Sequence, residues 1–455
     1  MSLDGNNSSD GLVKEAEHLL RELFPICRSI TGNGVRQTLS RLQKVVEFDV
    51  KEIPTGTICY DWVVPDEWNI NDAYIQDLSG KKIADFKKNN LHLVSYSIPV
   101  NKVISFQELL KHLHTLPQLP NAIPYRVSYY NKEWGFCLSF KEFNELDKKK
   151  SYHVIVDSTL KPGSLTYGEY CIKGSSEKEF LIWTYCCHPS LANDNLSGMV
   201  LWALLLRELK FRKTRHSYRF VIAPETIGAI TYLSQNEEEM KNIYGGFILT
   251  CVAGSEKFSY KSTFLKEHEI DRVVDRVFRE SNIDYISYPF DVNGSDERQF
   301  SSPYFRIPIG TVCRGKYYEY DYYHTSLDNL DYINSENLIQ TFRIYLRIID
   351  YLENNLNYVS LNQKGEPMFG KRNLYTKIGG PFKQKAVNKE QFSREYDITI
   401  TGLQMEREFD AMRWLIFYGD GKNTLLDISE KTDIPLETLH QVAKILREKG
   451  LLEIK

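Results

Sequence analysis

Histidine and acidic residues recur in this chain at points where apolar segments of strand length end. His188 and Asp194 follow the apolar segment Phe180–Cys187, and Glu225 follows Tyr218–Ala223. In an open α/β sheet, the carboxyl ends of the parallel strands form the edge at which ligands bind. We therefore expect these three side chains to lie near one another. Imidazole and carboxylate groups together are ligands for a metal such as zinc.

The chemistry predicted for such a group is metal-assisted hydrolysis. A catalytic zinc ion uses about three protein ligands and keeps one position open for water, whose pKa then falls to about 7. A carboxylate close to that water can act as general base. His188 and Asp194 are candidate ligands, and Glu225, at the carboxyl end of a neighbouring strand, suits the base.

Each of these residues also has a purely structural interpretation. A single histidine such as His188 is often a structural residue. Asp194 stands where the N-cap residue of the next helix would stand, and Glu225 falls in the first turn of a helix, where the helix dipole favours a negative charge. Metal binding is favoured for Asp194 because its neighbours Asn193 and Asn195 could cap the helix instead.

Two further polar segments follow along the chain. His324 begins the segment His-Thr-Ser-Leu-Asp-Asn, and Asp328 of that segment could orient the His324 ring as the outer partner of a metal ligand or could cap the next helix. Asp296 lies in Gly-Ser-Asp-Glu-Arg-Gln-Phe, where it could position a substrate amine or begin a turn. The sequence leaves both pairs of alternatives open.

These motifs resemble those of the zinc aminopeptidase clan, which includes leucyl aminopeptidases and glutaminyl cyclases. Ala-Asn-Asp-Asn-Leu-Ser-Gly (192–198) is similar to the Asp-centred signature of the clan, and Ala-Pro-Glu-Thr-Ile-Gly (223–228) is similar to its Glu-Glu-Val-Gly motif. The segments at 294–300 and 324–329 resemble its Ser-Asp-His and last-ligand motifs. The four motifs occur in the order found in the clan.

Over nearly its whole length, the chain also resembles a bacterial family of aminopeptidase-like proteins. Members of that family have a small inserted domain and a C-terminal winged helix, and they are associated with polysaccharide biosynthesis. The resemblance implies that His188, Asp194 and His324 are zinc ligands and that Glu225 is the general base.

The chain departs from the clan at two ligand positions. The second acid of the Glu-Glu motif is Thr226 here, and the acidic ligand expected after the next strand is missing, with Cys251 near its place. A single zinc ion is therefore favoured over two. Glu225 could be a fourth ligand rather than the base. Cys251 could be a thiolate ligand, although a buried strand cysteine is favoured.

The elements that must position these residues alternate between strand and helix. Apolar segments at His153–Val156, Phe180–Cys187, Tyr218–Ala223 and Gly246–Cys251 predict strands. Alternation of such strands with helices predicts an α/β fold in which a mixed, mostly parallel sheet lies between helices. The helices are expected at Gly198–Leu209, Ile227–Gln235, Glu267–Glu280 and Ser335–Asn354.

The N-terminal part of the chain is expected to contribute to two domains. Residues 1–65, with two helices divided by Pro25 and a turn at 31–34, should complete the aminopeptidase-like domain formed by residues 151–362. Residues 66–150 hold short alternating segments punctuated by Pro and Gly, which predicts a small inserted β-rich domain. Its expected strands are Ala73–Leu78, Lys82–Phe86, Val94–Ile98, Tyr125–Tyr130 and Trp134–Phe140.

Residues 386–455 predict a winged helix-turn-helix domain that follows a linker at 363–385. Residues 391–455 contain 9 Lys and Arg against 12 Asp and Glu residues, so the attraction to phosphate that dominates DNA binding is lacking. A protein contact, self-association or a structural role is therefore favoured over nucleic-acid binding. The expected elements are helices at Glu406–Phe417, Asp427–Lys431 and Leu436–Lys449 and a wing strand at Leu451–Ile454.

Composition also indicates which other partners and which cellular location to expect. The 455 residues carry a formal net charge of −3, which gives no reason to expect an anionic membrane as a partner. No segment reaches about 18 uninterrupted apolar residues, the N-terminus lacks the features of a signal peptide, and the eight cysteines show no CxxC spacing. These features predict a soluble cytoplasmic protein with reduced cysteines.

Three functions are compatible with the sequence. The favoured one is a zinc-dependent aminopeptidase-like hydrolase that cleaves an amide bond next to a free amine in a peptide or amino-acyl substrate. The second is a zinc amidohydrolase that acts on an amino-sugar or peptidyl intermediate of polysaccharide biosynthesis. The third is a non-catalytic, ligand-sensing regulator that acts through the winged helix.

Overall fold

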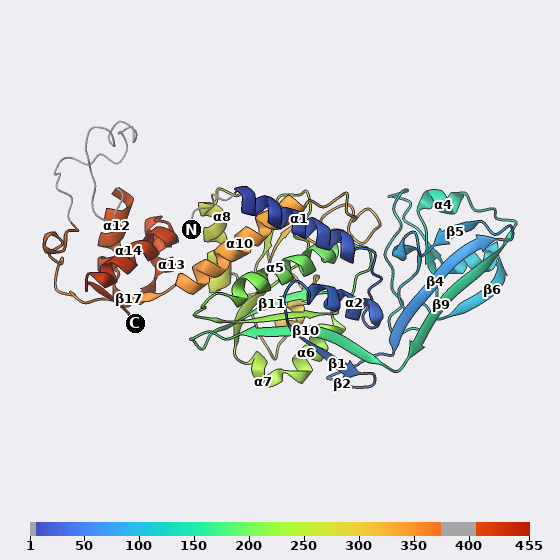
Figure 1. Cartoon of the computed structure of the whole chain (residues 1–455), viewed down its shortest axis with the longest axis horizontal. Helices are drawn as coiled ribbons and strands as arrows, with labels where there is room; N and C mark the ends of the chain where they lie inside the picture. The colour runs from blue at the N-terminus through green and yellow to red at the C-terminus, as the bar shows by residue number, and fades with distance from the viewer. Residues whose placement is uncertain (1–5, 375–405) are drawn as a thin grey trace, which may run out of the picture. The chain divides into compact units, whose positions relative to one another are not determined.

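The computed structural model describes residues 6–374 and 406–455, and the chain divides into two compact units (Figure 1). The first unit contains residues 1–271 and 283–346, and the second contains residues 272–282 and 347–455. All candidate site residues named above belong to the first unit. The domain boundaries expected from composition remain predictions.

An eight-stranded sheet forms the framework of the first unit. The strands from β12 through β11 and β13 to β16 are parallel, whereas the pairs β1–β10, β10–β12 and β14–β16 are antiparallel. The central strand β11 is buried along its whole length, as expected of an apolar segment covered on both faces. The predicted α/β fold with a mixed, mostly parallel sheet is confirmed. The strand order is β1 (Asp49–Pro54), β10 (Ser164–Ile172), β12 (Ser217–Ala223), β11 (Glu179–Tyr185), β13 (Ile243–Ile248), β16 (Ile309–Arg314), β14 (Phe258–Lys261) and β15 (Tyr285–Tyr288).

Helices cover both faces of this sheet. Helices α1 and α5 lie on one side of it, and α6 and α7 lie on the other (Figure 1). The predicted turn separates α1 from α2, because Gly32 has a φ of +101° and a Cβ atom there would lie 2.1 Å from the Trp68 carbonyl oxygen. The helices are α1 (Asn6–Leu23), α2 (Asn33–Leu42), α5 (Gly198–Lys210), α6 (Ile227–Gln235), α7 (Glu237–Met240), α8 (Glu269–Glu280), α9 (Glu297–Phe300) and α10 (Ser335–Asn354).

The inserted region forms an antiparallel four-stranded sheet in the order β5 (Lys82–Asp85), β4 (Glu67–Asp77), β9 (Ser151–Lys161) and β6 (Val100–Ser105). The expectation that His153–Val156 belongs to the main sheet is wrong, because this segment lies in β9. Burial alternates along β9, which is typical of a strand with one packed face rather than of a central parallel strand.

Other short elements complete the inserted region. The strands expected at Val94–Ile98 and Tyr125–Tyr130 do not form, because Tyr96 and Tyr130 adopt left-handed backbone conformations with φ of 72° and 66°. The segments that do form are β7 (Leu113–His114), β8 (Phe136–Cys137), α3 (Phe106–Leu109) and α4 (Phe140–Asn144). The short strands β2 (Ile58–Cys59) and β3 (Trp62–Val63) precede the inserted region.

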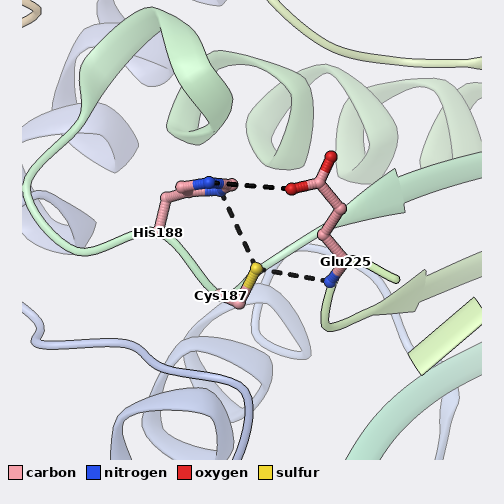
Figure 2. A group of neighbouring side chains, drawn as sticks. All are labelled: Cys187, His188 and Glu225. Carbon is pink, nitrogen blue, oxygen red and sulfur yellow. Dashed lines mark hydrogen bonds and ion pairs between the residues drawn. The ribbon is translucent and has the colours of Figure 1, made fainter. Parts of the chain in front are cut away.

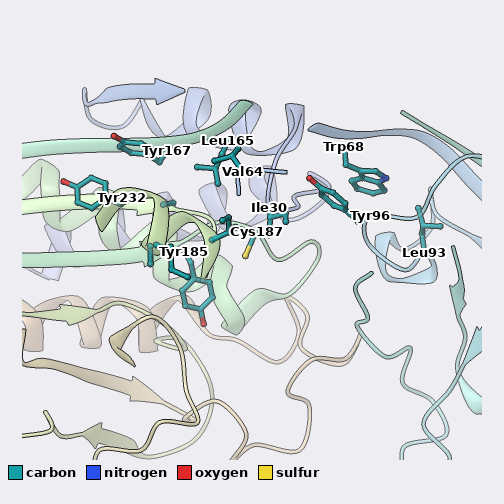
Figure 3. Close-up of a cluster of buried hydrophobic side chains, with 14 of the residues drawn as sticks. Ile30, Val64, Trp68, Leu93, Tyr96, Leu165, Tyr167, Tyr185, Cys187 and Tyr232 are labelled. Carbon is teal, nitrogen blue, oxygen red and sulfur yellow. The ribbon is translucent and has the colours of Figure 1, made fainter. Parts of the chain in front are cut away.

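The four-stranded and eight-stranded sheets share one hydrophobic core. Trp68 and Tyr96 of the inserted region belong to the same buried cluster as Leu165, Tyr185 and Cys187 of the main sheet and its loops (Figure 3). A shared core fixes the inserted region against the edge of the main sheet at which the site residues lie. This packing lets the inserted region contribute side chains to the site.

The second unit contains the predicted winged helix-turn-helix. Strands β18, β17 and β19 form its sheet, of which only β19 was expected, and Thr424 caps α13 through the backbone N–H of Asp427. Parts of the expected linker and C-terminal domain, residues 375–405, lie outside the described residues. No helix in the described ranges is both long and apolar enough to cross a bilayer. The elements are β17 (Asn357–Ser360), α12 (Glu406–Phe417), β18 (Asp420–Thr424), α13 (Leu425–Thr432), α14 (Leu436–Glu448) and β19 (Leu452–Ile454).

Candidate active site

His188 and Asp194 lie in the connection between β11 and α5. Asp194 lies in an irregular turn, Ala192–Ser197, in which its φ and ψ of −110° and 84° are not helical, and the Asp194–Asn195 peptide bond is cis. Asp328 fixes this turn, because its carboxylate accepts the backbone N–H groups of Asn193 at 2.6 Å and of Asp194 at 3.0 Å. The Asp194 carboxylate is thereby held at the end of the sheet.

Three of the predicted ligands meet at this place. His188, Asp194 and His324 each offer one ligand atom, and these atoms all lie within 4.8 Å of one another. We call these three residues the candidate metal centre. The His188 and Asp194 side chains are 5% and 1% exposed, whereas the His324 side chain is 32% exposed, so the centre is open to solvent on the side of His324.

Two buried atoms of the candidate metal centre have only each other as a polar partner. Asp194 Oδ2 and His324 Nε2 lie 3.0 Å apart, at ion-pair distance, and neither forms a hydrogen bond with any other residue that the structure describes. Two ligand atoms that each lie about 2.0–2.2 Å from the same tetrahedral zinc ion would be separated from each other by a distance close to these 3.0 Å. Two imidazoles and one carboxylate are also a donor set of catalytic zinc sites. The residues present therefore fit a zinc ion.

The ionisation states of the ligands suit a cation. Burial lowers the pKa of His188 to about 4, so its imidazole is neutral near pH 7 and has a lone pair to donate. Burial opposes ionisation of Asp194, but the neighbouring His188 and His324 outweigh it and lower its pKa to about 2. The centre thus offers the neutral ring of His188 and the carboxylate anion of Asp194.

Glu225 lies beside this centre, as predicted for a general base. Its Oε2 is 3.7 Å from His188 Nε2, and its Oε1 accepts the hydroxyl of Ser295 at 2.7 Å (Figure 2). Burial, and then the negative charges of Asp296 and Asp194, raise the pKa of Glu225 well above its usual range. The side chain remains 24% exposed. A carboxyl with a raised pKa that reaches solvent can accept and return a proton.

Asp296 supports the turn that carries Glu225. Its two oxygens accept the indole N–H of Trp183 and the backbone N–H of Thr226, each at 2.7 Å. Thr226 has a positive φ of 61°, a conformation that costs free energy and needs such support. These contacts support a distant turn, which is neither of the two alternatives left by the sequence. Contact with a substrate amine stays a prediction.

Asp328 also acts through the backbone. Besides the turn at Asp194, it accepts the hydroxyl of Tyr320 at 2.9 Å, and it forms no hydrogen bond with the His324 ring. The expectation that Asp328 orients this ring is wrong. Tyr323 stacks on the ring instead, with centroids 3.9 Å apart.

One face of β11 and its extension holds three acidic segments, a feature that the sequence analysis missed. Trp183 binds Asp296, the Tyr185 hydroxyl donates to Asp194 Oδ1 at 2.5 Å, and Cys187 Sγ accepts the backbone N–H of Glu225 at 3.3 Å. Alternate residues of a strand share a face, so the spacing of Trp183, Tyr185 and Cys187 was a usable signal.

The inserted region contributes Tyr125, which the sequence analysis also missed. Its backbone N–H donates to the His324 carbonyl at 2.8 Å, and its ring lies 5.2 Å from the rings of both His188 and His324. His324 has a positive φ of 55°, and this hydrogen bond helps to hold it. Tyr125 lies far from both histidines in the sequence, so no local pattern could reveal the contact.

Cys251 lies near Asp194 but belongs neither to the candidate metal centre nor to the second group of described side chains close enough to hold a metal, which is Cys187, His188 and Glu225. Its thiol is fully buried, and burial, followed by the charge of Asp194, raises its pKa. It packs with Cys313, Tyr317 and Tyr320 in a small separate cluster. Cys251 is therefore a buried structural cysteine, but it lies beyond β13 with a φ of 53°, so the strand position favoured from the sequence is wrong.

Comparison with known families agrees with this fold. A family model described as "Domain of unknown function (DUF4910)" matches residues 17–355. The chain belongs to the DUF4910 family. A relative from Clostridium acetobutylicum, whose name refers to polysaccharide biosynthesis and an aminopeptidase-like domain, is 44% identical over 449 residues, which cover 99% of this chain and 98% of that protein. A second model, winged helix-turn-helix, matches residues 396–454 and confirms the predicted C-terminal module.

Solved structures extend the likeness of this DUF4910 chain. A crystal structure of a Clostridium acetobutylicum protein described as a peptidase has 43% identity, a TM-score of 0.88, and coverage of 99% of this chain and 98% of that one. BSAP, a zinc aminopeptidase from Bacillus subtilis, has 15% identity and a TM-score of 0.54 over 76% of this chain and 94% of that one. A peptidase M28 precursor from Shewanella amazonensis has 13% identity and a TM-score of 0.51 over 75% and 95%. The fold is that of the zinc aminopeptidases, as the resemblance implied.

Proposed function

We propose that this protein is a zinc-dependent aminopeptidase-like hydrolase that cleaves an amide bond next to a free amine. The observation that carries the proposal is the pair of Asp194 Oδ2 and His324 Nε2, 3.0 Å apart at the carboxyl edge of the sheet, which have no polar partner among the described residues besides each other. A complete structural cluster would pair these buried atoms with protein donors and acceptors. An open pair of metal-ligand atoms beside a carboxyl with a raised pKa supports a hydrolytic site.

His188, Asp194 and His324 would hold one zinc ion. When bound, zinc supplies Lewis acidity to an amide carbonyl and to water. The Glu225 carboxylate takes a proton from the attacking water and gives it to the leaving amine nitrogen. The hydroxyl of Ser295 orients the Glu225 carboxylate through Oε1.

A second candidate keeps the same residues and changes the substrate to the amide of an amino sugar. The name of the Clostridium acetobutylicum relative, which refers to polysaccharide biosynthesis, favours it. Next to the centre, Tyr318 is 62% exposed and packs against Tyr323, with ring centroids 4.8 Å apart. Exposed aromatic rings beside a polar site suit a ligand with an apolar face.

The test is zinc content and hydrolysis in the wild type and in Glu225→Gln. We expect about one zinc per chain in both proteins, and a loss of hydrolysis in the variant by about 10²–10⁴-fold, the usual contribution of a general base. Glu237→Gln, whose carboxylate binds Tyr60 and Tyr304 outside the site, is the matched control and should keep both properties.

The substrates are amino-acyl amides with a free amine, the same compounds acetylated on the amine, and N-acyl amino sugars. Preference for the free amine would support the first candidate, and cleavage of the amino sugars alone would support the second. Loss of zinc from Glu225→Gln would make Glu225 a ligand and contradict its role as base. Absence of zinc from the wild type after reconstitution would refute the proposal.

A further inference from the structure

We propose that Cys187 is a positioning residue whose sulfur contacts both the His188 ring and the Glu225 backbone and so fixes the position of each relative to the other. The inference rests on the proposed function, since it concerns the same site. Cys187 follows β11, is 2% exposed, and lies between these two residues (Figure 2). Neither the clan motifs nor the ligand set assigns it a role.

The two ring nitrogens of His188 have different partners. Nδ1 lies 3.8 Å from Cys187 Sγ, and Nε2 lies 3.7 Å from Glu225 Oε2. In the described part of the chain, the sulfur is the one polar atom within hydrogen-bond distance of Nδ1. Nε2 therefore faces the open side of the site, and Nδ1 faces the protein.

The partner of Nδ1 decides which tautomer the His188 ring adopts. A neutral imidazole that donates Nε2 to a metal carries its proton on Nδ1, and the acceptor of that proton fixes the orientation of the ring. This acceptor is usually a carboxylate, a carbonyl or a water. Here the position is held by Cys187 Sγ, which is a weaker acceptor.

The same sulfur also accepts a hydrogen bond from the backbone of Glu225. The N–H of Glu225 donates to Cys187 Sγ at 3.3 Å. One atom thus contacts both a metal ligand and the residue proposed as base. Arg28 fixes the main chain independently, because its Nε donates to the His188 carbonyl at 2.9 Å. The Tyr125 and Tyr185 rings pack against the imidazole, with centroids 5.2 Å and 5.3 Å away, and the sulfur adds the hydrogen-bonding contact to Nδ1.

Cys186 provides a matched control for this role. It is as buried as Cys187, and neighbours in an extended segment point in opposite directions. It belongs to neither group of described side chains that could hold a metal. Cys186→Ala removes the same atoms from the same strand end and leaves the His188 and Glu225 contacts intact.

The experiment measures zinc affinity by competition with a chromophoric chelator in the wild type, Cys187→Ala, Cys187→Ser and Cys186→Ala. Loss of the outer partner of a metal-binding histidine lowers metal affinity by about 10–100-fold, which we expect for Cys187→Ala. Cys187→Ser should recover most of this loss, because a hydroxyl can accept from Nδ1. Cys186→Ala should match the wild type.

Cobalt substitution separates positioning from direct ligation. The cobalt-loaded wild type should lack the near-ultraviolet sulfur-to-metal charge-transfer band, while its visible bands should change in Cys187→Ala. A charge-transfer band that disappears in Cys187→Ser would make Cys187 a ligand and overturn the inference. Unchanged zinc affinity in a folded Cys187→Ala would overturn it too, with the proposed function intact. Absence of zinc from the wild type would remove both.

Discussion

The candidate metal centre and the Arg36–Glu67 pair both place charged side chains in largely buried positions of the first unit, but they differ in how their polar atoms are matched. Both oxygens of Glu67 accept from Arg36, at 2.9 Å and 2.5 Å. Asn69 and the backbone N–H of Ser164 add hydrogen bonds to the same carboxylate. This pair joins helix α2 to the first strand of the inserted sheet and is complete without any added ligand.

The candidate metal centre is incomplete in the same sense. Asp194 Oδ2 and His324 Nε2 are buried atoms that contact each other at 3.0 Å but have no further hydrogen-bond partner among the described residues. Leaving buried polar atoms unpaired costs about 1–3 kcal/mol each, so such a group persists where function requires it. The comparison indicates that burial and charge alone do not identify a functional site. What distinguishes the two clusters is whether the protein supplies a full set of hydrogen-bond partners to the buried polar atoms.

The largest effect is expected from breaking the incomplete group. Asp194→Asn removes the one anionic ligand and should weaken zinc binding by more than about 100-fold, the upper cost of losing an outer partner. Equilibrium dialysis with zinc measures this. A variant that binds zinc like the wild type would contradict the ligand assignment.

The complete pair should behave in the opposite way. Glu67→Gln breaks a charged hydrogen-bond network and should lower the free energy of unfolding by about 2 kcal/mol at pH 7, with or without zinc. Arg36, by the side-chain hydrogen bond, lowers the pKa of Glu67 from 4.5 to about 2. Because the folded pKa is the lower one, this stabilisation is full above pH 4.5 and is lost as the pH falls towards 2.

Denaturant unfolding at pH 7 and near pH 3 tests this prediction. The difference between Glu67→Gln and the wild type should shrink at the lower pH. A difference that depends on zinc instead would show that the two clusters are coupled, and the contrast drawn between them would fail.

Much of the framework followed from the sequence because its signals are local. Continuous apolar segments predicted β11, β12 and β13, and the residues at their carboxyl ends gave His188, Asp194 and Glu225. The parallel arrangement of these strands is what brings the three residues together. His324 came from the polar segment that it begins and from the motif resemblance, and the structure places it in the same group.

What the sequence could not supply depends on contacts between distant segments. Tyr125 reaches His324 only because the inserted region shares a core with the main sheet. The assignment of His153–Val156 to the main sheet failed because an apolar segment does not reveal whether one face or both are covered. Asp328 was linked to the wrong partner, since the sequence does not show that its carboxylate meets the turn at Asp194.

The smallest expected effect is on zinc affinity, and it distinguishes a buried hydroxyl that contacts a metal ligand from one that contacts only the backbone. Tyr185→Phe removes the donor to Asp194 Oδ1, so zinc affinity should fall by about 10-fold, at the lower end for an outer partner, with little change in unfolding of the zinc-free protein. Tyr345→Phe is the matched control, since its hydroxyl donates to the Val312 carbonyl and accepts the Val312 N–H. It should lower the free energy of unfolding by about 1 kcal/mol and leave zinc affinity unchanged. If both variants affected stability and neither affected zinc, Asp194 would belong with the complete, structural clusters.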